Sequence, residues 1–196
     1  MSRDQRPQLP RIWFIAVQSS GTDIGEEVHT LNFSSDLTVS LDQANATATV
    51  GLVGDPWIVV SKSSNETTQS DDTLSNDSAL TFAVSASTKY AFRAVVHINT
   101  PAAADFKWSI NGPAAPTLVH LHGRADDGSS NLSYFNTAFG TSNAVTSTST
   151  DYVLQIHGIV HNGANSGTVA FQWAQNTSTA SDTTVYAGSH IQYRTV

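Results

Sequence analysis

The C-terminal stretch of the chain, residues 152–196, alternates between apolar and polar positions in three runs. The apolar positions of these runs are, in order, Leu154, Ile156 and Val160; Val169, Phe171 and Trp173; and Val185, Ala187, Ile191 and Tyr193. A period of two with one apolar face predicts half-buried antiparallel strands. The joint HNGANSG (161–167) holds glycines and asparagines, which accept the positive φ of a tight hairpin. The polar joint QNTSTASD (175–182) predicts a connection between two sheets.

Similar alternation continues upstream, through the segments WIVVSK (57–62), LTFAV (80–84), YAFRAVVHI (90–98), DFKWSI (105–110), TLVHLHG (117–123) and LSYFNTAF (132–139). Together with the three C-terminal runs they give about eight or nine short strands separated by turn signals, and no helix-period segment competes with them. We therefore predict an all-β fold, with an antiparallel jelly-roll or β-sandwich domain over residues 57–196. Residues 63–78, acidic and rich in hydroxyl groups without periodicity, are predicted to form a surface loop.

The N-terminal part of the chain divides into an arm and a small β module. Residues 1–11 hold two prolines and no apolar pattern, which predicts an extended arm, disordered when free in solution. Residues 12–17, IWFIAV, are apolar on both faces and predict a strand that is either central in a sheet or covered by a partner. LTVSL (37–41) and ATATVGLV (46–53) predict a hairpin. The Asp55-Pro56 pair predicts a boundary that ends the module, residues 12–56.

The C-terminal runs carry a resemblance. HNGANSGTVAFQWAQNTS (161–178), followed by TTVYAGSHIQYRTV (183–196), resembles the C-terminal end of structural proteins of tailed bacteriophages, where it closes a jelly roll similar to the tumour-necrosis-factor fold. Residues 80–117 resemble the first half of that domain, so the likeness covers roughly residues 57–196, about 70 % of the chain. Residues 28–53 resemble a small β module of phage tail and appendage proteins. The resemblance implies a virion component that assembles as a trimer.

Composition narrows the classes of partner. Only 13 % of the residues are charged and the formal net charge is −7, which argues against nucleic acid as a partner because phosphate binding needs concentrated Lys and Arg. The chain has no cysteine, which excludes disulfides and zinc–thiolate sites. The apolar run of residues 12–17 is too short for a signal peptide or a membrane span. We expect no membrane partner, synthesis in the host cytoplasm and a final location in the virion.

Histidines are the most conspicuous candidates for chemistry. His120 and His122 share one face of a predicted strand, a spacing that two metal ligands could use. No cysteine or acidic residue completes a ligand set in the strands, so we expect no metal and no cofactor. No Gly-x-Ser-x-Gly elbow occurs, and the acidic residues fall mostly in predicted loops instead of apolar runs. We therefore expect no catalytic residues and no enzymatic activity.

A structural role remains, most simply that of a trimeric capsid decoration protein that stabilises the capsid surface. The alternative is a tail or neck appendage whose jelly roll binds a host glycan. Arg3, Arg6 and Arg11 concentrate positive charge in an acidic chain, and we expect them, with Trp13 and Phe14, to contact the major capsid protein or another virion protein. The polar faces that carry His120, His122, His157 and His190 are poor in carboxylates and lysines, so we expect them to lie at an interface between protomers.

Overall fold

The computed structural model describes residues 57–126, 131–146 and 151–196, together with the backbone of four strands nearer the N-terminus. The chain separates into two compact units, Met1–Gly54 and Asp55–Val196, and the predicted boundary at Asp55-Pro56 adjoins this division. The predicted arm, residues 1–11 with Arg3, Arg6 and Arg11, lies outside the described residues, as do Trp13 and Phe14 of the predicted strand that follows.

The described residues of the first unit form two antiparallel pairs of strands. β1 (Ile15–Ser19) pairs with β2 (Thr22–Val28), and β3 (Leu37–Asp42) pairs with β4 (Thr47–Leu52). The β3–β4 pair is the predicted hairpin. The interpretation of residues 12–17 as a strand in the centre of a sheet is wrong for the part that is described, because β1 belongs to a two-stranded sheet.

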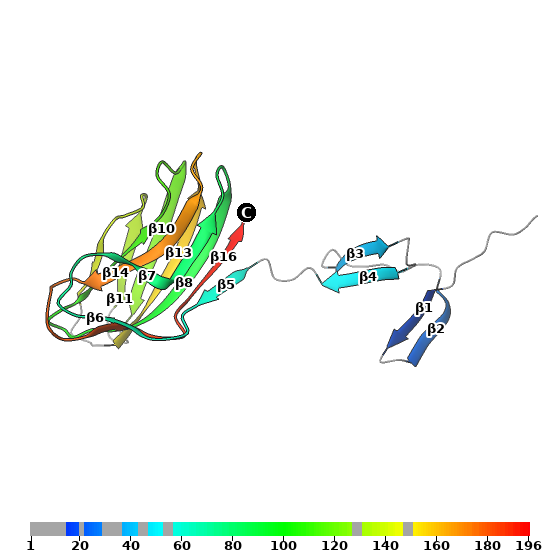
Figure 1. The fold of residues 1–196 in the computed structure, drawn as a ribbon, viewed down its shortest axis with the longest axis horizontal. Coiled ribbons are helices and arrows are strands. Elements are labelled where there is room, and N and C mark those ends of the chain that lie inside the picture. The colour runs from blue at the N-terminus through cyan, green and yellow to red at the C-terminus, as the bar shows by residue number, and fades with distance from the viewer. Residues whose placement is uncertain are drawn as a thin grey trace, which may run out of the picture. The chain divides into compact units, whose positions relative to one another are not determined.

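The second unit is built entirely from strands in its described residues, which confirms the predicted all-β class. Its strands are β5 (Ile58–Ser61), β6 (Glu66–Thr68), β7 (Ser75–Val84), β8 (Lys89–Asn99), β9 (Phe106–Asn111), β10 (Leu118–Asp126), β11 (Asn131–Asn136), β12 (Asn143–Val145), β13 (Asp151–His161), β14 (Gly167–Gln175), β15 (Thr183–Val185) and β16 (His190–Thr195). Figure 1 shows them as two layers.

The order of the strands is that of a jelly roll. One layer contains the order β5–β16–β8–β13 and the other β7–β14–β9–β12, all antiparallel, and the chain crosses between the layers at nearly every step. This alternation is how a double-sheet jelly roll joins its sheets. The hairpin β10–β11, inserted between β9 and β12, extends the first layer beyond β13, and β15 and β6 extend it beside β8. The first layer thereby becomes an eight-stranded sheet.

The core lies between the layers and follows the predicted alternation. On β13, Leu154, Ile156 and Val160 are fully buried, whereas Gln155, His157 and Ile159, which point the other way, are exposed. Phe171 and Trp173 of β14 are also buried, as predicted, and Trp173 stacks near Phe106 with 6.1 Å between ring centroids. On β14, however, Ala170 and Ala174 are buried too, so this strand lacks the exposed face that the alternation predicts.

Two glycines of the large sheet allow aromatic rings to pack against bare backbone. A Cβ atom at Gly158 would lie 2.1 Å from the ring of Phe92, and one at Gly123 would lie 2.4 Å from the ring of Trp108. Real Cβ contacts are never that short, so any side chain there would displace a core aromatic ring. The two positions therefore require glycine.

The joint 162–166 does not form the tight turn that its glycines suggest. Neither Gly163 nor Gly167 has a positive φ. Instead, Asn162 is fully buried, and its side-chain amide donates to the carbonyl oxygens of Ser85 (2.9 Å) and Asn165 (2.6 Å). The asparagine therefore fixes the loop through its amide group, and the prediction of a positive-φ hairpin is wrong.

The third C-terminal run is two strands and not one. β15 ends at Val185, and β16 begins at His190 after a turn in which Gly188 has a φ of +88°. The turn is anchored by two backbone hydrogen bonds, from Lys62 N to Ser189 O and from Gly188 N to Lys62 O, both 2.8 Å. Ala187, predicted to face the core, is exposed in this turn. The predicted connection between sheets is confirmed, because residues 176–182 join β14 of the small sheet to β15 of the large one.

Residues 63–78 are not simply a surface loop. They contain β6, which pairs with β15, and the beginning of β7, and they bury the carboxylate of Asp77 at 1 % exposure. The expectation that acidic residues lie in loops is therefore wrong for Asp77, because an ion pair and backbone donors supply the hydrogen bonds that make its burial tolerable.

Replacing Trp173 by alanine should lower the free energy of unfolding by about 3–5 kcal/mol, the usual range for a buried large aromatic residue. The change also removes the hydrogen bond from Trp173 Nε1 to Asp77 Oδ2 (3.1 Å). Urea titration followed by circular dichroism measures the effect. Tyr186→Ala, which truncates a ring that is 36 % exposed, should change the value by no more than about 0.5 kcal/mol. Equal stability of the two variants would contradict the packing described here.

Candidate interaction surface on the large sheet

The outward side chains of β5, β16, β8, β13, β10 and β11 form one continuous surface, called here the outer face. Strict alternation on β10 and β13 leaves every second residue of each strand exposed. Paired strands hold residues that lie opposite one another on the same side of the sheet. The pairing of the strands therefore decides which outward side chains become neighbours.

The centre of the outer face is a row of three basic or imidazole side chains. His122 of β10 lies opposite His157 of β13, which in turn lies opposite Arg93 of β8. At the edge of the sheet, Phe135 of β11 lies opposite His122, and His122 Nε2 and Ser133 Oγ form a hydrogen bond of 2.9 Å. The row contains no carboxylate, so Arg93 has no opposite charge among its cross-strand neighbours.

A second group surrounds the indole of Trp57, just before β5. The guanidinium groups of Arg93 and Arg194 lie 4.5 Å and 4.8 Å from the centre of the indole ring. Both distances are within the range of cation–π attraction, which stabilises a guanidinium over an aromatic face. Trp57 therefore holds two arginines of different strands in fixed positions on the outer face.

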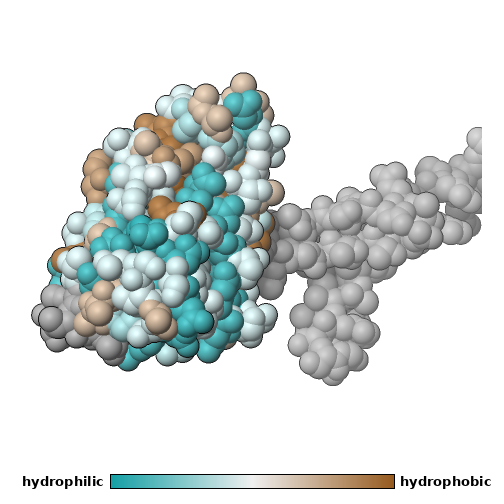
Figure 2. All heavy atoms as spheres, turned by 60° about the vertical axis from the view of Figure 1, so that its left-hand side comes forward, coloured by the Kyte–Doolittle hydropathy of each residue, from teal (hydrophilic) through white to brown (hydrophobic). Residues whose placement is uncertain are grey.

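A hollow of about 440 Å³ lies between these two groups and is lined mainly by apolar atoms. Its lining includes Trp57, Arg93, His157, Phe135 and Ile159. Phe135 is 66 % exposed and Ile159 is 52 % exposed, large fractions for side chains of this kind. Figure 2 shows how hydrophobic residues gather in patches between hydrophilic ones on one side of the molecule. Exposed apolar patches rimmed by polar groups mark interaction sites.

Charge is distributed unevenly over the outer face. Four of the six lysines and arginines in residues 57–196 lie on it, namely Lys89, Arg93, Arg124 and Arg194. The carboxylates that the described residues place on this face, Asp126 and Asp151, lie together at one end, where β10 ends and β13 begins. The chain as a whole is acidic, so the excess of basic over acidic side chains on the outer face differs in sign from the net charge.

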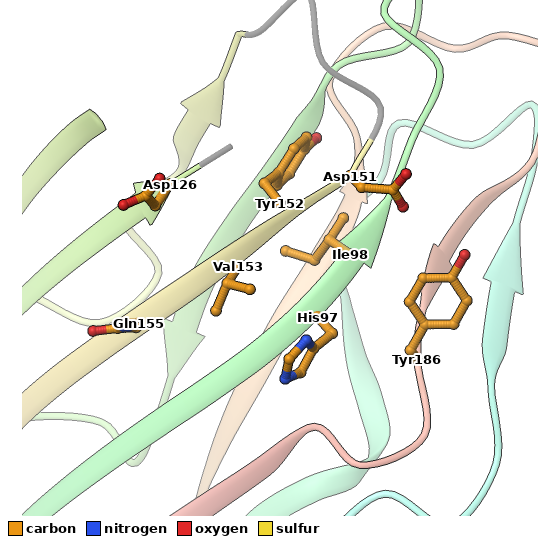
Figure 3. A pocket seen from close by; sticks show the side chains of 8 residues that line it. All are labelled: His97, Ile98, Asp126, Asp151, Tyr152, Val153, Gln155 and Tyr186. Atoms are coloured by element: carbon orange, nitrogen blue, oxygen red, sulfur yellow. The ribbon is translucent and has the colours of Figure 1, made fainter. Parts of the chain in front are cut away.

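The acidic end of the outer face contains a second hollow, of about 510 Å³ (Figure 3). His97 of β8 and Val153 of β13 lie opposite each other in it, and Tyr186 lines it from the turn before β16. Asp151 accepts a hydrogen bond of 2.8 Å from Asn99 Nδ2. Burial raises the pKa of Tyr152, which also lines this hollow, far above its ordinary value. Burial likewise raises the pKa of Tyr134 on β11 to about 12.

The four histidines predicted at an oligomer interface all lie on the outer face. His120, His122 and His157 are exposed, and His190 is half-buried on β16, where its Nδ1 lies 3.2 Å from Gly188 O. His120 also lies near Phe135, with 5.8 Å between ring centroids. The structure brings the four together on one side of one sheet. Their contact with another protomer stays a prediction.

Several residues of the outer face were not among the predicted contact residues, namely Trp57, Arg93, Arg194, Phe135 and Ile159. The alternation itself indicates that Arg93, Ile159 and Arg194 point away from the core, because they alternate with the apolar positions of their runs. What alternation cannot supply is the register that sets them beside one another.

No metal-binding cluster is assembled in the described part of the chain. It contains no cluster of three or more His, Asp or Glu side chains that could hold a metal ion. The described residues contain no helix that is long and apolar enough to cross a membrane. They form strands and the connections between strands.

Comparison with known proteins adds little to this geometry. No family model and no curated protein sequence matches the chain. A solved structure, described as "Structure of infectious bursal disease virus Gx strain", aligns with 92 % of this chain at 11 % sequence identity and a TM-score of 0.19. The chain spans 54 % of that structure's chain. A similarity this weak supports neither a family nor a function.

Replacing Ile159 by lysine tests whether the outer face is buried between protomers, as the sequence analysis expects. A charge at this position should shift the protein from oligomer towards monomer, because burying an unpaired charge is costly. Sedimentation velocity at micromolar concentration measures the shift, and circular dichroism checks that the fold is kept.

Ala83→Lys is the matched control, since Ala83 is an exposed position in a strand of the other sheet. It should leave the sedimentation coefficient unchanged. A wild-type protein that is already monomeric, or an Ile159→Lys variant of wild-type size, would count against an interface on the outer face.

Proposed function

We propose that this protein is a non-enzymatic structural component of a tailed-bacteriophage virion, a homotrimeric capsid decoration protein that binds and stabilises the capsid surface. The observation that carries the proposal is the outer face, on which exposed apolar side chains and the arginines held over Trp57 occur together on one sheet. Such a surface suits adhesion to another protein more than solvation or catalysis.

The fold supports the same role. Jelly rolls occur in viral capsid and lectin domains, and the antiparallel frame gives a rigid platform for a broad contact surface. A fold alone does not imply a function, so this support is general.

The residues that carry the phage resemblance stabilise the fold of the domain and do not point to a particular contact with a partner protein. Trp173 is in the core, and fully buried Gln175 uses its Nε2 to donate to Ser181 O (2.7 Å) and its Oε1 to accept from Thr179 N (2.9 Å). Asn162 holds the loop between β13 and β14. These side chains fix loops and sheets, which explains why the motif indicates a type of domain without indicating its partner.

Attachment to the particle is proposed to use the N-terminal arm as well. Arg3, Arg6 and Arg11 would form forked hydrogen bonds with carboxylates of the capsid protein, and Trp13 and Phe14 would add apolar contact. Their positive charge complements an acidic partner, as does that of Arg93 and Arg194 on the outer face.

Deleting residues 2–11 should leave the jelly roll folded and weaken attachment to the particle by about tenfold or more, the effect of losing roughly 1.4 kcal/mol of binding free energy. Particles that lack the protein are mixed with the full-length or truncated form, and bound copies are counted after sedimentation. Substituting Arg3, Arg6 and Arg11 by glutamine in the full-length chain separates the charge from the length of the arm.

Full occupancy at unchanged affinity would contradict a role for the arm. A full-length protein that binds no capsid would contradict the decoration role. If that protein instead bound host cells through a surface glycan, the appendage alternative would replace it.

A further inference from the structure

A buried lysine and two acidic residues meet where β5 leads into the loop before β6. Lys62, directly after β5, is 3 % exposed, and Asp77, in β7 of the opposite layer, is 1 % exposed. Buried charges of this kind are rare unless they are paired. The assembly is separate from the outer face and has no part in the proposed adhesion.

The lysine amine lies directly against the Asp77 carboxyl group. Lys62 Nζ is 3.0 Å from Oδ1 and 2.9 Å from Oδ2 of Asp77. These two contacts also bring Nζ within about 3.5 Å of Cγ, the carbon atom between the two oxygens. Reacting atoms about 3–3.5 Å apart are in the range of a near-attack arrangement. Glu66 of β6 contacts the same amine through Oε2.

Three donors surround the Asp77 carboxyl group from the other side. The backbone amides of Ala79 and Leu80 both donate to Oδ1 at 2.9 Å, and Trp173 Nε1 donates to Oδ2 at 3.1 Å. Two fixed amide donors on one oxygen are the arrangement that stabilises the oxyanion of an acyl-transfer intermediate. The Asp77 carboxyl group therefore has a nucleophile, Lys62 Nζ, on one side. On the other side, the Ala79 and Leu80 amides can stabilise an oxyanion on Oδ1.

We propose that Lys62 and Asp77 condense into an intramolecular isopeptide bond, with Glu66 as the proton carrier. The step begins when the ammonium proton passes to the Asp77 carboxylate, which leaves a neutral amine and a carboxylic acid and exchanges a buried ion pair for two uncharged groups. The lone pair of Lys62 Nζ attacks Cγ of Asp77, and the developing negative charge on Oδ1 is held by the Ala79 and Leu80 amides.

Glu66 completes the proton balance. Its carboxylate accepts a proton from the attacking nitrogen and returns it to Oδ2, which leaves Cγ as water while Trp173 Nε1 donates to that oxygen. One N–C bond forms, one C–O bond breaks and one water molecule is released, so no oxidant or second reactant is needed. The Glu66 side chain is 31 % exposed and lines a hollow of about 140 Å³ beside Trp173, which gives the water a way out.

The bond would lock the first strand of the jelly roll. β5 lies at the edge of the large sheet and is held by four residue pairs with β16. The chain enters this unit through β5, so a pull on the preceding residues would first peel this strand away. A covalent link from Lys62 to Asp77 joins the end of β5 to the opposite layer and stops the peeling there.

Intact-mass spectrometry of the purified, denatured full-length protein tests the proposal. The mass should be about 18 Da below that of the sequence, the loss of one water molecule. Tryptic cleavage after Lys62 should fail, and fragmentation should identify a branched peptide that joins Lys62 to Asp77. Glu66→Gln, which keeps the size of the proton carrier and removes its basicity, should restore the full mass in a protein that still folds.

A control addresses a second source of the same mass change. Asp127-Gly128 is a sequence that can lose water to form a succinimide, which would also lower the mass. The loss should persist in Asp127→Ala and disappear in Lys62→Met, whereas Lys89→Met, a lysine elsewhere in the unit, should keep it.

Two results would overturn the proposal. The first is a wild-type protein of full sequence mass that trypsin cleaves after Lys62, because the trio would then be an ordinary buried ion pair. The second is a mass loss that persists in Lys62→Met. Since the wild-type measurement alone decides the first point, the proposal can be refuted even if the variants fail to fold.

Discussion

The fold depends at one point on the burial of a single carboxylate. Asp77 of β7 is approached by Lys62 from the end of β5 and by Trp173 from β14, and its own strand supplies the amides of Ala79 and Leu80. Removing Lys62 would leave this buried carboxylate without its counter-charge, which is costly in a low-dielectric interior. The entry strand, the small sheet and the core aromatic residues are therefore coupled through one side chain.

The sequence was sufficient to predict the class of fold because alternation reports directly on which face is buried. It placed Phe171, Trp173 and the apolar residues of β13 correctly. It failed at Asp77 because the surrounding residues are acidic and hydroxyl-rich, and burial there depends on Lys62, which lies 15 residues earlier. The sequence also predicted a single run where the structure has β15 and β16, because the alternation keeps its phase across the turn at Gly188.

The candidate surface could be predicted only in part for a related reason. The shared face of His120 and His122 follows from their spacing within one strand, whereas the neighbourhood of His122, His157 and Arg93 depends on the register of three strands. Trp57 and Arg194 come from nearly opposite ends of the domain's sequence and meet because β16 lies between β5 and β8. Long-range register of this kind has no local signal. The residues of the arm lie outside the described part of the chain, and their role rests on charge alone.

The central claim is that the outer face of the large sheet is buried when the protein is assembled. Hydroxyl-radical footprinting of the purified native protein measures this directly, residue by residue. Phe135 and Ile159, more than half exposed in the isolated chain, should be oxidised much more slowly than in a monomeric variant, while Tyr186, outside the centre of this face, should react equally in both. Oxidation of Phe135 and Ile159 at the full rate of exposed side chains in the native protein would contradict the claim.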